Sequence, residues 1–81
     1  MADRANRAYR LIVRRGGTLP SWLAAPDRVD HIEVVEIESG EVVLYWDCPA
    51  PRTRRLLRAL RTDLARSNAS DFIDTWRAYT A

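Results

Sequence analysis

A run of arginines that begins after Pro51 is the strongest candidate for binding chemistry in this sequence. The run interleaves six arginines with four leucines: Arg52, Arg54, Arg55, Arg58, Arg61 and Arg66 with Leu56, Leu57, Leu60 and Leu64. Because the leucines recur at helical spacing, the pattern predicts an amphipathic helix whose outer face is basic. Such a face can bind phosphate groups, since each neutralised phosphate releases counterions. The same face can also be solvated or paired with the carboxylates of a partner.

Four of these residues form a candidate nucleic-acid-binding site: Arg54, Arg55, Arg58 and Arg61. Spacings of three and four residues place Arg54, Arg58 and Arg61 on one side of the predicted helix. The sequence contains no turn-and-recognition-helix pattern, which disfavours a DNA reader of that kind. All thirteen basic residues are arginine. This bias is typical of a GC-rich bacterial genome, so arginine here also stands where lysine is usual.

Catalytic and metal-binding chemistry lack a constellation of residues. His31 is the only histidine and Cys48 the only cysteine. A cysteine nucleophile needs a base and a third group that orients the base, and a zinc site needs several ligands of this kind. The predicted hairpin brings His31 near Cys48, but strand pairing alone accounts for that. Gly16-Gly17 matches neither glycine-rich phosphate-binding pattern, so we expect no enzyme, no cofactor and no bound metal.

Length and composition predict one small domain over residues 1–81. A chain of this size buries only about 60–65% of its unfolded surface, and 47% of its residues are hydrophobic. Together these observations favour additional burial in an oligomer. A single cysteine favours a reducing compartment, and no stretch has the pattern of a membrane span or a secretion signal. We therefore expect a cytoplasmic protein.

Charge is segregated along the chain. Residues 1–25 carry a net charge of +4, residues 26–50 a net charge of −6, and residues 51–81 a net charge of +4. This layout favours an acidic hairpin that lies beside basic elements, either within one chain or across a dimer. Exposed ion pairs stabilise little individually, but they can determine which surfaces meet.

The clearest predicted element is a β-hairpin with strands over residues 31–38 and 41–47. Both segments are rich in β-branched and aromatic residues, and Ser39-Gly40 is a two-residue turn between them. The predicted core face carries Val35, Ile37, Val42, Leu44 and Trp46. The predicted outer face carries the apolar residues Ile32, Val34, Val43 and Tyr45. A shift of the register by one residue would exchange these faces.

The remaining elements complete an α+β domain. Alternating residues predict a strand over residues 8–15, which the Gly16-Gly17 pair ends. The arginine-rich helix is expected over residues 50–66, and a second helix, capped by Asn68 or Ser70, over residues 70–79. We therefore predict a three-stranded antiparallel sheet that the two C-terminal helices pack against on one face.

Two apolar surfaces are candidates for partner binding. Trp22 and Leu23 lie in the connection over residues 18–30, and an exposed tryptophan is a typical hot spot, although it can also fold back over the core. The outer hairpin face is the second surface: Ile32, Val34, Val43 and Tyr45. These features predict a small non-enzymatic interaction or adaptor module that binds itself, as a homodimer, or another protein, and no membrane. The alternative is a small nucleic-acid-binding regulator that uses the helix over residues 52–66.

Overall fold

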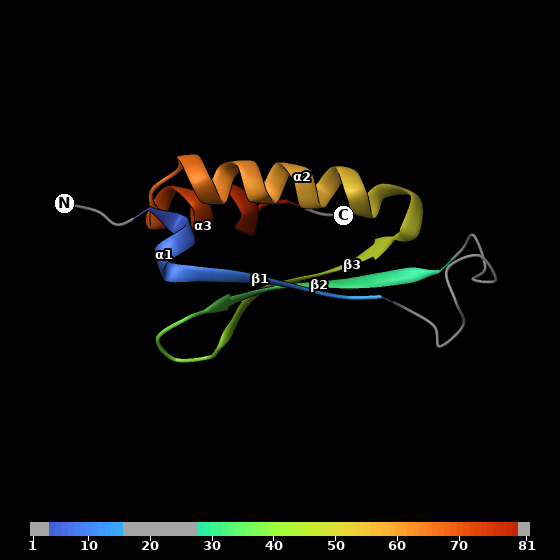
Figure 1. Cartoon of the computed structure of the whole chain (residues 1–81), viewed down its shortest axis with the longest axis horizontal. Helices are drawn as coiled ribbons and strands as arrows, with labels where there is room; N and C mark the ends of the chain where they lie inside the picture. Colours follow the sequence, from blue (N-terminus) through green and yellow to red (C-terminus); the bar gives the residue numbers. More distant parts are fainter. Residues whose placement is uncertain (1–3, 16–27, 80–81) are drawn as a thin grey trace.

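A three-stranded antiparallel sheet, covered on one face by helices, is the architecture of this computed structural model (Figure 1). The structure describes residues 4–15 and 28–79. Strand β2 lies between β1 and β3. In chain order the elements are α1 (Ala5–Ala8), β1 (Tyr9–Arg14), β2 (Val29–Glu36), β3 (Val42–Pro49), α2 (Ala50–Arg66) and α3 (Ala69–Arg77). The α+β class, the three strands and the two C-terminal helices are as predicted.

The one-turn helix α1 was not predicted, because four residues are too few to show a helical repeat. Hydrogen bonds to the end of α2 fix its position. The Ala5 N–H donates to the Ser67 carbonyl at 2.9 Å, and the Arg4 guanidinium donates to the Ala65 carbonyl at 3.0 Å. Ala5 is fully buried, so the start of the described chain covers one end of the core.

The β2–β3 hairpin has a longer turn than the predicted Ser39-Gly40 pair. The Glu36 N–H donates to the Glu41 carbonyl at 2.8 Å, which leaves residues 37–40 as the loop. The Ser39 hydroxyl donates to the Glu36 carboxylate at 2.7 Å and closes this loop. Gly40 has a φ of 76°, a conformation that glycine adopts without strain.

The strand register also differs from the predicted one. The longer loop sets Val35 opposite Val42, a shift of two residues, and a bulge between Val34 and Val35 leaves a net shift of one residue along the rest of the ladder. Val34 lies opposite Leu44, and Ile32 lies opposite Trp46. Because side chains alternate between the two faces, the shift moves the β2 residues to the other side relative to β3. Ile32 and Val34 were predicted on the outer face, and that assignment is wrong: both are fully buried beside Leu44 and Trp46.

Three residues lose their predicted place in the core: Val35, Ile37 and Val42. Val35 follows a bulge in the β2–β3 ladder and is only half-buried. Ile37 and Val42 are 47% and 50% exposed. The assignment failed because the bulge between Val34 and Val35, which the pattern of side chains does not indicate, changes which β2 residues share a face with Leu44 and Trp46.

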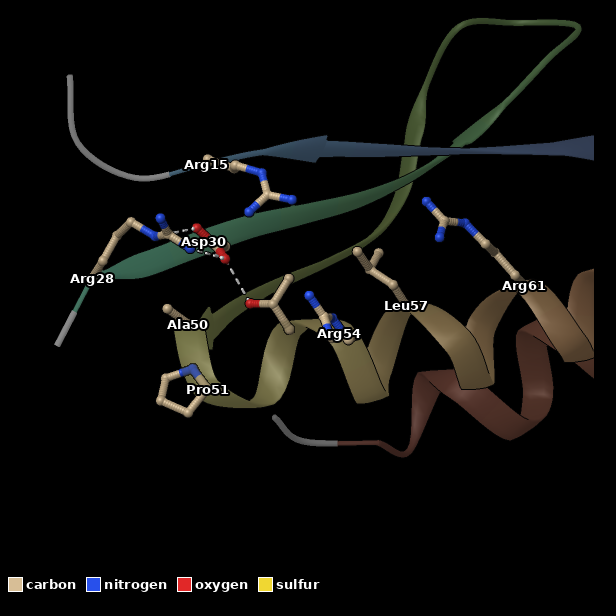
Figure 2. Close-up of a pocket in the computed structure, with 9 residues that line it drawn as sticks. Arg15, Arg28, Asp30, Ala50, Pro51, Arg54, Leu57 and Arg61 are labelled. Carbon is tan, nitrogen blue, oxygen red and sulfur yellow. Dashed lines mark hydrogen bonds and ion pairs between the residues drawn. The ribbon is translucent and has the colours of Figure 1, made fainter. Parts of the chain in front are cut away.

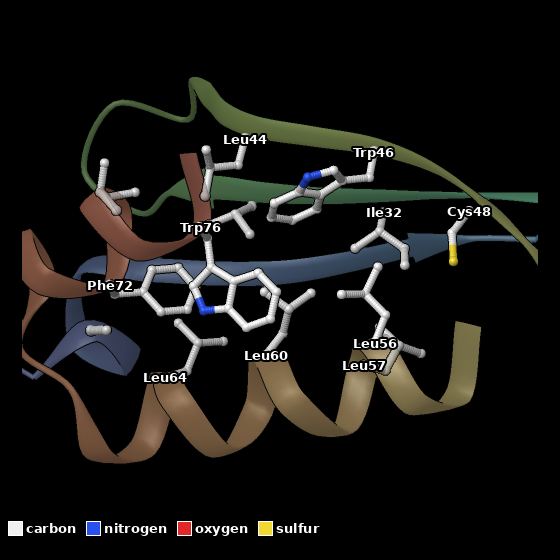
Figure 3. Close-up of a cluster of buried hydrophobic side chains, with 13 residues drawn as sticks. Ile32, Leu44, Trp46, Cys48, Leu56, Leu57, Leu60, Leu64, Phe72 and Trp76 are labelled. Atoms are coloured by element: carbon white, nitrogen blue, oxygen red, sulfur yellow. The ribbon is translucent and has the colours of Figure 1, made fainter. Parts of the chain in front are cut away.

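The core lies between the sheet and the two C-terminal helices (Figure 3). The helix residues buried in it are Leu56, Leu57, Leu60, Leu64, Phe72, Ile73 and Trp76. Leu60 and Phe72 are fully buried, and the Trp76 indole N–H donates to the Asp63 carboxylate at 2.9 Å, which joins α3 to α2. The predicted leucine stripe is therefore confirmed.

The ends of the helices explain how α2 is held in place. The Ala50 N–H donates to the Arg28 carbonyl at 2.8 Å, so the start of α2 is attached to the start of β2. Asn68 caps α3, as predicted, by accepting the Asp71 N–H at 2.9 Å.

Within residues 4–15 and 28–79, no helix is long and apolar enough to cross a membrane.

Candidate functional site

The sheet face opposite the helices is the first candidate surface, and we call it the open sheet face. It carries alternate residues of the three strands: Arg10, Ile12 and Arg14 of β1, His31, Glu33 and Val35 of β2, and Val43, Tyr45 and Asp47 of β3. All the described helices lie on the other side of the sheet (Figure 1). Val43 and Tyr45 are 37% and 51% exposed, so apolar and charged groups share this face.

His31, Tyr45 and Asp47 form a hydrogen-bonded cluster at one end of the open sheet face. The Tyr45 hydroxyl donates to Asp47 Oδ1 at 2.7 Å, and His31 Nδ1 lies 2.6 Å from the same oxygen. The Tyr45 oxygen lies 2.8 Å from His31 Nδ1. Because a carboxylate can only accept, this geometry assigns the proton of a neutral His31 ring to Nδ1.

The cluster shifts the pKa of two of its members away from neutrality. The hydrogen bond from Tyr45, followed by the one from His31, holds the pKa of Asp47 below its ordinary value. The bond to Asp47 raises the pKa of Tyr45. Both shifts therefore follow from hydrogen bonds within the cluster.

Cys48 is separate from this cluster. Its side chain is 1% exposed and belongs to the core on the helix side of the sheet, whereas His31 lies on the open sheet face. The predicted proximity of the two residues along the hairpin therefore does not bring their side chains together. Among the described residues there is also no group of three potential metal ligands.

A cavity of about 500 Å³ between the start of α2 and the neighbouring ends of β1 and β2 is the second candidate surface (Figure 2). We call it the arginine cavity. Its lining consists of Arg15, Arg28, Asp30, Ala50, Pro51, Thr53, Arg54, Leu57 and Arg61. The antiparallel pairing of β1 with β2 brings Arg15 and Arg28 to the same end of the sheet. Three segments that are distant in the sequence therefore contribute arginines to one site.

A fully buried carboxylate, that of Asp30, forms part of this lining. It accepts a hydrogen bond of 2.7 Å from the Thr53 hydroxyl, and the Arg28 Nε atom lies 3.1 Å from it. A buried charge is costly unless it is paired and hydrogen-bonded. Arg28 and Thr53 therefore both engage the negative charge of Asp30.

The other arginines of the cavity have no such partner in the part of the chain that the structure describes. Among the described residues, no carboxylate lies within ion-pair distance of Arg15, Arg54 or Arg61. The first turn of α2 contains no acidic residue, and its N-terminal dipole adds positive potential. Counted over the described residues, the lining of the cavity carries four guanidinium groups and one carboxylate and is therefore electropositive.

The predicted nucleic-acid-binding arginines divide between two places on α2. Arg54 and Arg61 line the arginine cavity, and Arg55 and Arg58 line a shallow hollow beside Pro51 to which Arg54 also contributes. All four are exposed.

The acidic hairpin does not neutralise these arginines within the described part of the chain. No ion pair there joins α2 to the hairpin carboxylates Glu36, Glu38 and Glu41. The hairpin turn also lies on the opposite side of the sheet from α2 (Figure 1). The single arginine–glutamate pair found there is Arg14 with Glu33, at 3.4 Å on the open sheet face.

The predicted partner-binding residues lie in three different parts of the chain: on the open sheet face, in the core and outside the described residues. Val43 and Tyr45 lie on the open sheet face. Ile32 and Val34 are buried under the helices and cannot contact a partner in this fold. Trp22 and Leu23 lie outside the described residues.

Four residues of the arginine cavity were not singled out from the sequence: Arg15, Arg28, Asp30 and Thr53. Arg15 and Arg28 stand at the two ends of the connection between the first two strands. An antiparallel pairing of those strands places both ends together, so the signal was present. Asp30 and Thr53 gave no signal, because a single polar residue near a strand or helix start is most often solvated.

Comparisons of the chain with family models, with curated proteins and with solved structures found no match.

Proposed function

We propose that this chain is a non-enzymatic protein-interaction module that forms a homodimer through the open sheet face. One observation carries the proposal: no described element covers this face, although it contains the apolar residues Ile12, Val35, Val43 and Tyr45. Apolar side chains surrounded by charged ones are typical of an interaction surface. Covering the face would also add burial to a chain with a small core.

The arrangement of charge favours a second copy of the chain as the partner. Arg14 on β1, His31 on β2 and Asp47 on β3 are cross-strand neighbours in one row. A two-fold axis parallel to β2, between two facing sheets, sets β1 of each copy over β3 of the other. Arg14 of one copy then faces Asp47 of the other. One row further along, Ile12 faces Tyr45.

The size of the face predicts a reversible dimer. Three strands about 4.8 Å apart, with six residues at about 3.3 Å each, cover roughly 300 Å². A stable interface of standard size buries about 800 Å² on each partner. We therefore expect a dissociation constant in the micromolar range or weaker, so that monomer and dimer coexist in solution.

Sedimentation velocity over a concentration series tests the proposal. We expect the average mass to rise from monomer towards dimer as the concentration increases. Val43→Glu places a carboxylate on the face and should shift the equilibrium to monomer. Thr62→Glu changes an exposed site on α2 and should leave the equilibrium unchanged. A monomer at every concentration, or the same effect from both substitutions, would contradict dimerisation through this face.

Charge reversal tests the two-fold arrangement separately. Arg14→Asp and Asp47→Arg should each weaken the dimer, because each sets like charges opposite one another. The double variant restores opposite charges and should recover part of the lost affinity. If the double variant loses as much dimerisation free energy as the two single variants together, Arg14 and Asp47 do not face each other. The axis is then placed wrongly, even though the face is used.

Nucleic-acid binding by α2 is the second candidate function. It is favoured by the exposed arginines of that helix, of which Arg54, Arg58 and Arg61 have no carboxylate partner among the described residues. Fluorescence anisotropy with DNA and RNA at several salt concentrations tests it, since binding through phosphates weakens linearly in a log–log plot. Replacing the three arginines with glutamine should flatten that slope. No binding at physiological salt would leave the interaction module as the function.

A further inference from the structure

We infer that the arginine cavity is a binding site for a phosphate group. The cavity lies on the helix side of the sheet, away from the open sheet face. The inference is therefore independent of homodimer formation. It differs also from a phosphate contact by the outer face of α2, because the site includes Arg15 and is built around the buried pair of Arg28 and Asp30.

The charges in the cavity are not balanced from within the described chain. Asp30 is engaged with Arg28 and Thr53. Arg15, Arg54 and Arg61 project towards the space between the strands and α2 (Figure 2). Guanidinium groups that share one recess repel each other. A bound anion would convert this repulsion into attraction.

A phosphate fits this set of donors better than a carboxylate does. Each guanidinium carries five N–H donors in a planar fork that suits two oxygens of one anion. A phosphate group offers more acceptor oxygens and up to two negative charges, so three arginines can share it. A single carboxylate would neutralise only one of them.

The start of α2 contributes to the site mainly through the electrostatic field of the helix dipole, and less through its backbone N–H donors. The Ala50 N–H is already bonded to the Arg28 carbonyl, and Pro51 has no N–H. The helix dipole still favours a negative charge near this end. The guanidinium groups are therefore the binding groups.

The dimensions of the cavity point to a phosphate that is part of a larger ligand. Its volume of about 500 Å³ lies within the range of roughly 300–1,000 Å³ that small-molecule sites occupy. Ala50, Pro51 and Leu57 add an apolar part to the lining. A phosphate ester, either a free nucleotide or a segment of nucleic-acid backbone, would use both parts of the site.

Thermal denaturation in sodium phosphate and in sodium chloride of equal ionic strength provides the first test. We expect phosphate to raise Tm further than chloride, with a saturable dependence on concentration. Arg15→Gln and Arg61→Gln should each weaken phosphate binding about ten- to a hundredfold, because each removes charged hydrogen bonds. Arg66→Gln is the matched control, since Arg66 is an exposed arginine of α2 that does not line the cavity.

Titration with adenosine monophosphate and with a single-stranded oligonucleotide identifies the source of the phosphate. Tighter binding of the mononucleotide, lost in Arg15→Gln and Arg61→Gln, supports the site with a small ligand. Tighter binding of the oligonucleotide, lost in the same variants, supports it with a nucleic-acid backbone.

Two results would overturn the inference. One is that phosphate, mononucleotide and oligonucleotide all fail to bind beyond the effect of chloride. The other is that Arg66→Gln loses as much binding as the cavity variants. Loss of folding cannot imitate the expected result, because removing one of several like charges should leave Tm in chloride unchanged or higher.

Discussion

The Thr53 hydroxyl on α2 donates a hydrogen bond of 2.7 Å to the fully buried carboxylate of Asp30 on β2. The contact joins the start of the helix to the start of the strand. Arg28 contributes the opposite charge, with its Nε atom 3.1 Å from the same carboxylate. Because a buried carboxylate needs all its donors, this contact both stabilises the fold and fixes one wall of the arginine cavity.

Thr53→Val should lower the free energy of unfolding by about 1–3 kcal/mol, because it keeps the shape of the side chain but removes a donor to a buried charge. Urea denaturation measures the change. Thr53→Ser retains a hydroxyl and should lose less. Equal losses in the two variants would mean that the methyl group of Thr53, and not its hydroxyl, provides the stability.

Leu60→Ala should lower the free energy of unfolding by roughly 2–5 kcal/mol, because Leu60 is fully buried between α2 and the sheet. Arg58→Ala, at an exposed position of the same helix, should change it by about 0.5 kcal/mol or less. Denaturation midpoints and slopes for both variants provide the comparison. An unchanged midpoint and slope in Leu60→Ala would contradict its place in the core.

The helix layer could be predicted from the sequence because its signals are local. The leucines of α2 recur at helical spacing, and Asn68 is a favourable cap three residues before Asp71, whose N–H it accepts. The class of the fold followed from the order of the elements. Each of these inferences needs only residues that are close in the chain.

The faces of β2 and the arginine cavity could not be predicted in the same way. Ile32 and Val34, which are buried, resemble Val35 and Ile37, which were expected to be buried, so the pattern of side chains does not select the buried face. The selection comes from the bulge between Val34 and Val35, which follows the longer loop over residues 37–40. The cavity requires the relative positions of three segments, which no local pattern contains.

The pKa shifts on the open sheet face predict a pH dependence. The pKa of Asp47 is lowered by its hydrogen bonds from Tyr45 and His31. The stability that these bonds provide is therefore present above the ordinary carboxyl pKa and is lost as the pH falls through the lowered value. The pKa of Tyr45 is raised by the bond to Asp47, so its contribution is lost as the pH rises through that raised value.

NMR titration of the Asp47 side chain measures the first of these shifts. Tyr45→Phe removes the main donor and should raise the pKa of Asp47 towards its ordinary value. Absorbance titration of the tyrosines measures the second, and Asp47→Asn should lower the pKa of Tyr45. If neither substitution moves the partner's pKa, the two side chains are not hydrogen-bonded in solution.

Val34 and Val35 provide a matched test of the strand register, because they are neighbours with the same side chain in opposite environments. Val34 is fully buried, and Val35 is half-buried on the open sheet face. Val34→Asp would bury an unpaired carboxylate and should cost more than about 3 kcal/mol or prevent folding. Val35→Asp should cost about 1 kcal/mol or less and should weaken the proposed homodimer. Denaturant melts followed by circular dichroism measure the stability of both variants. If Val35→Asp is the less stable of the two, the result would support the register predicted from the two-residue turn.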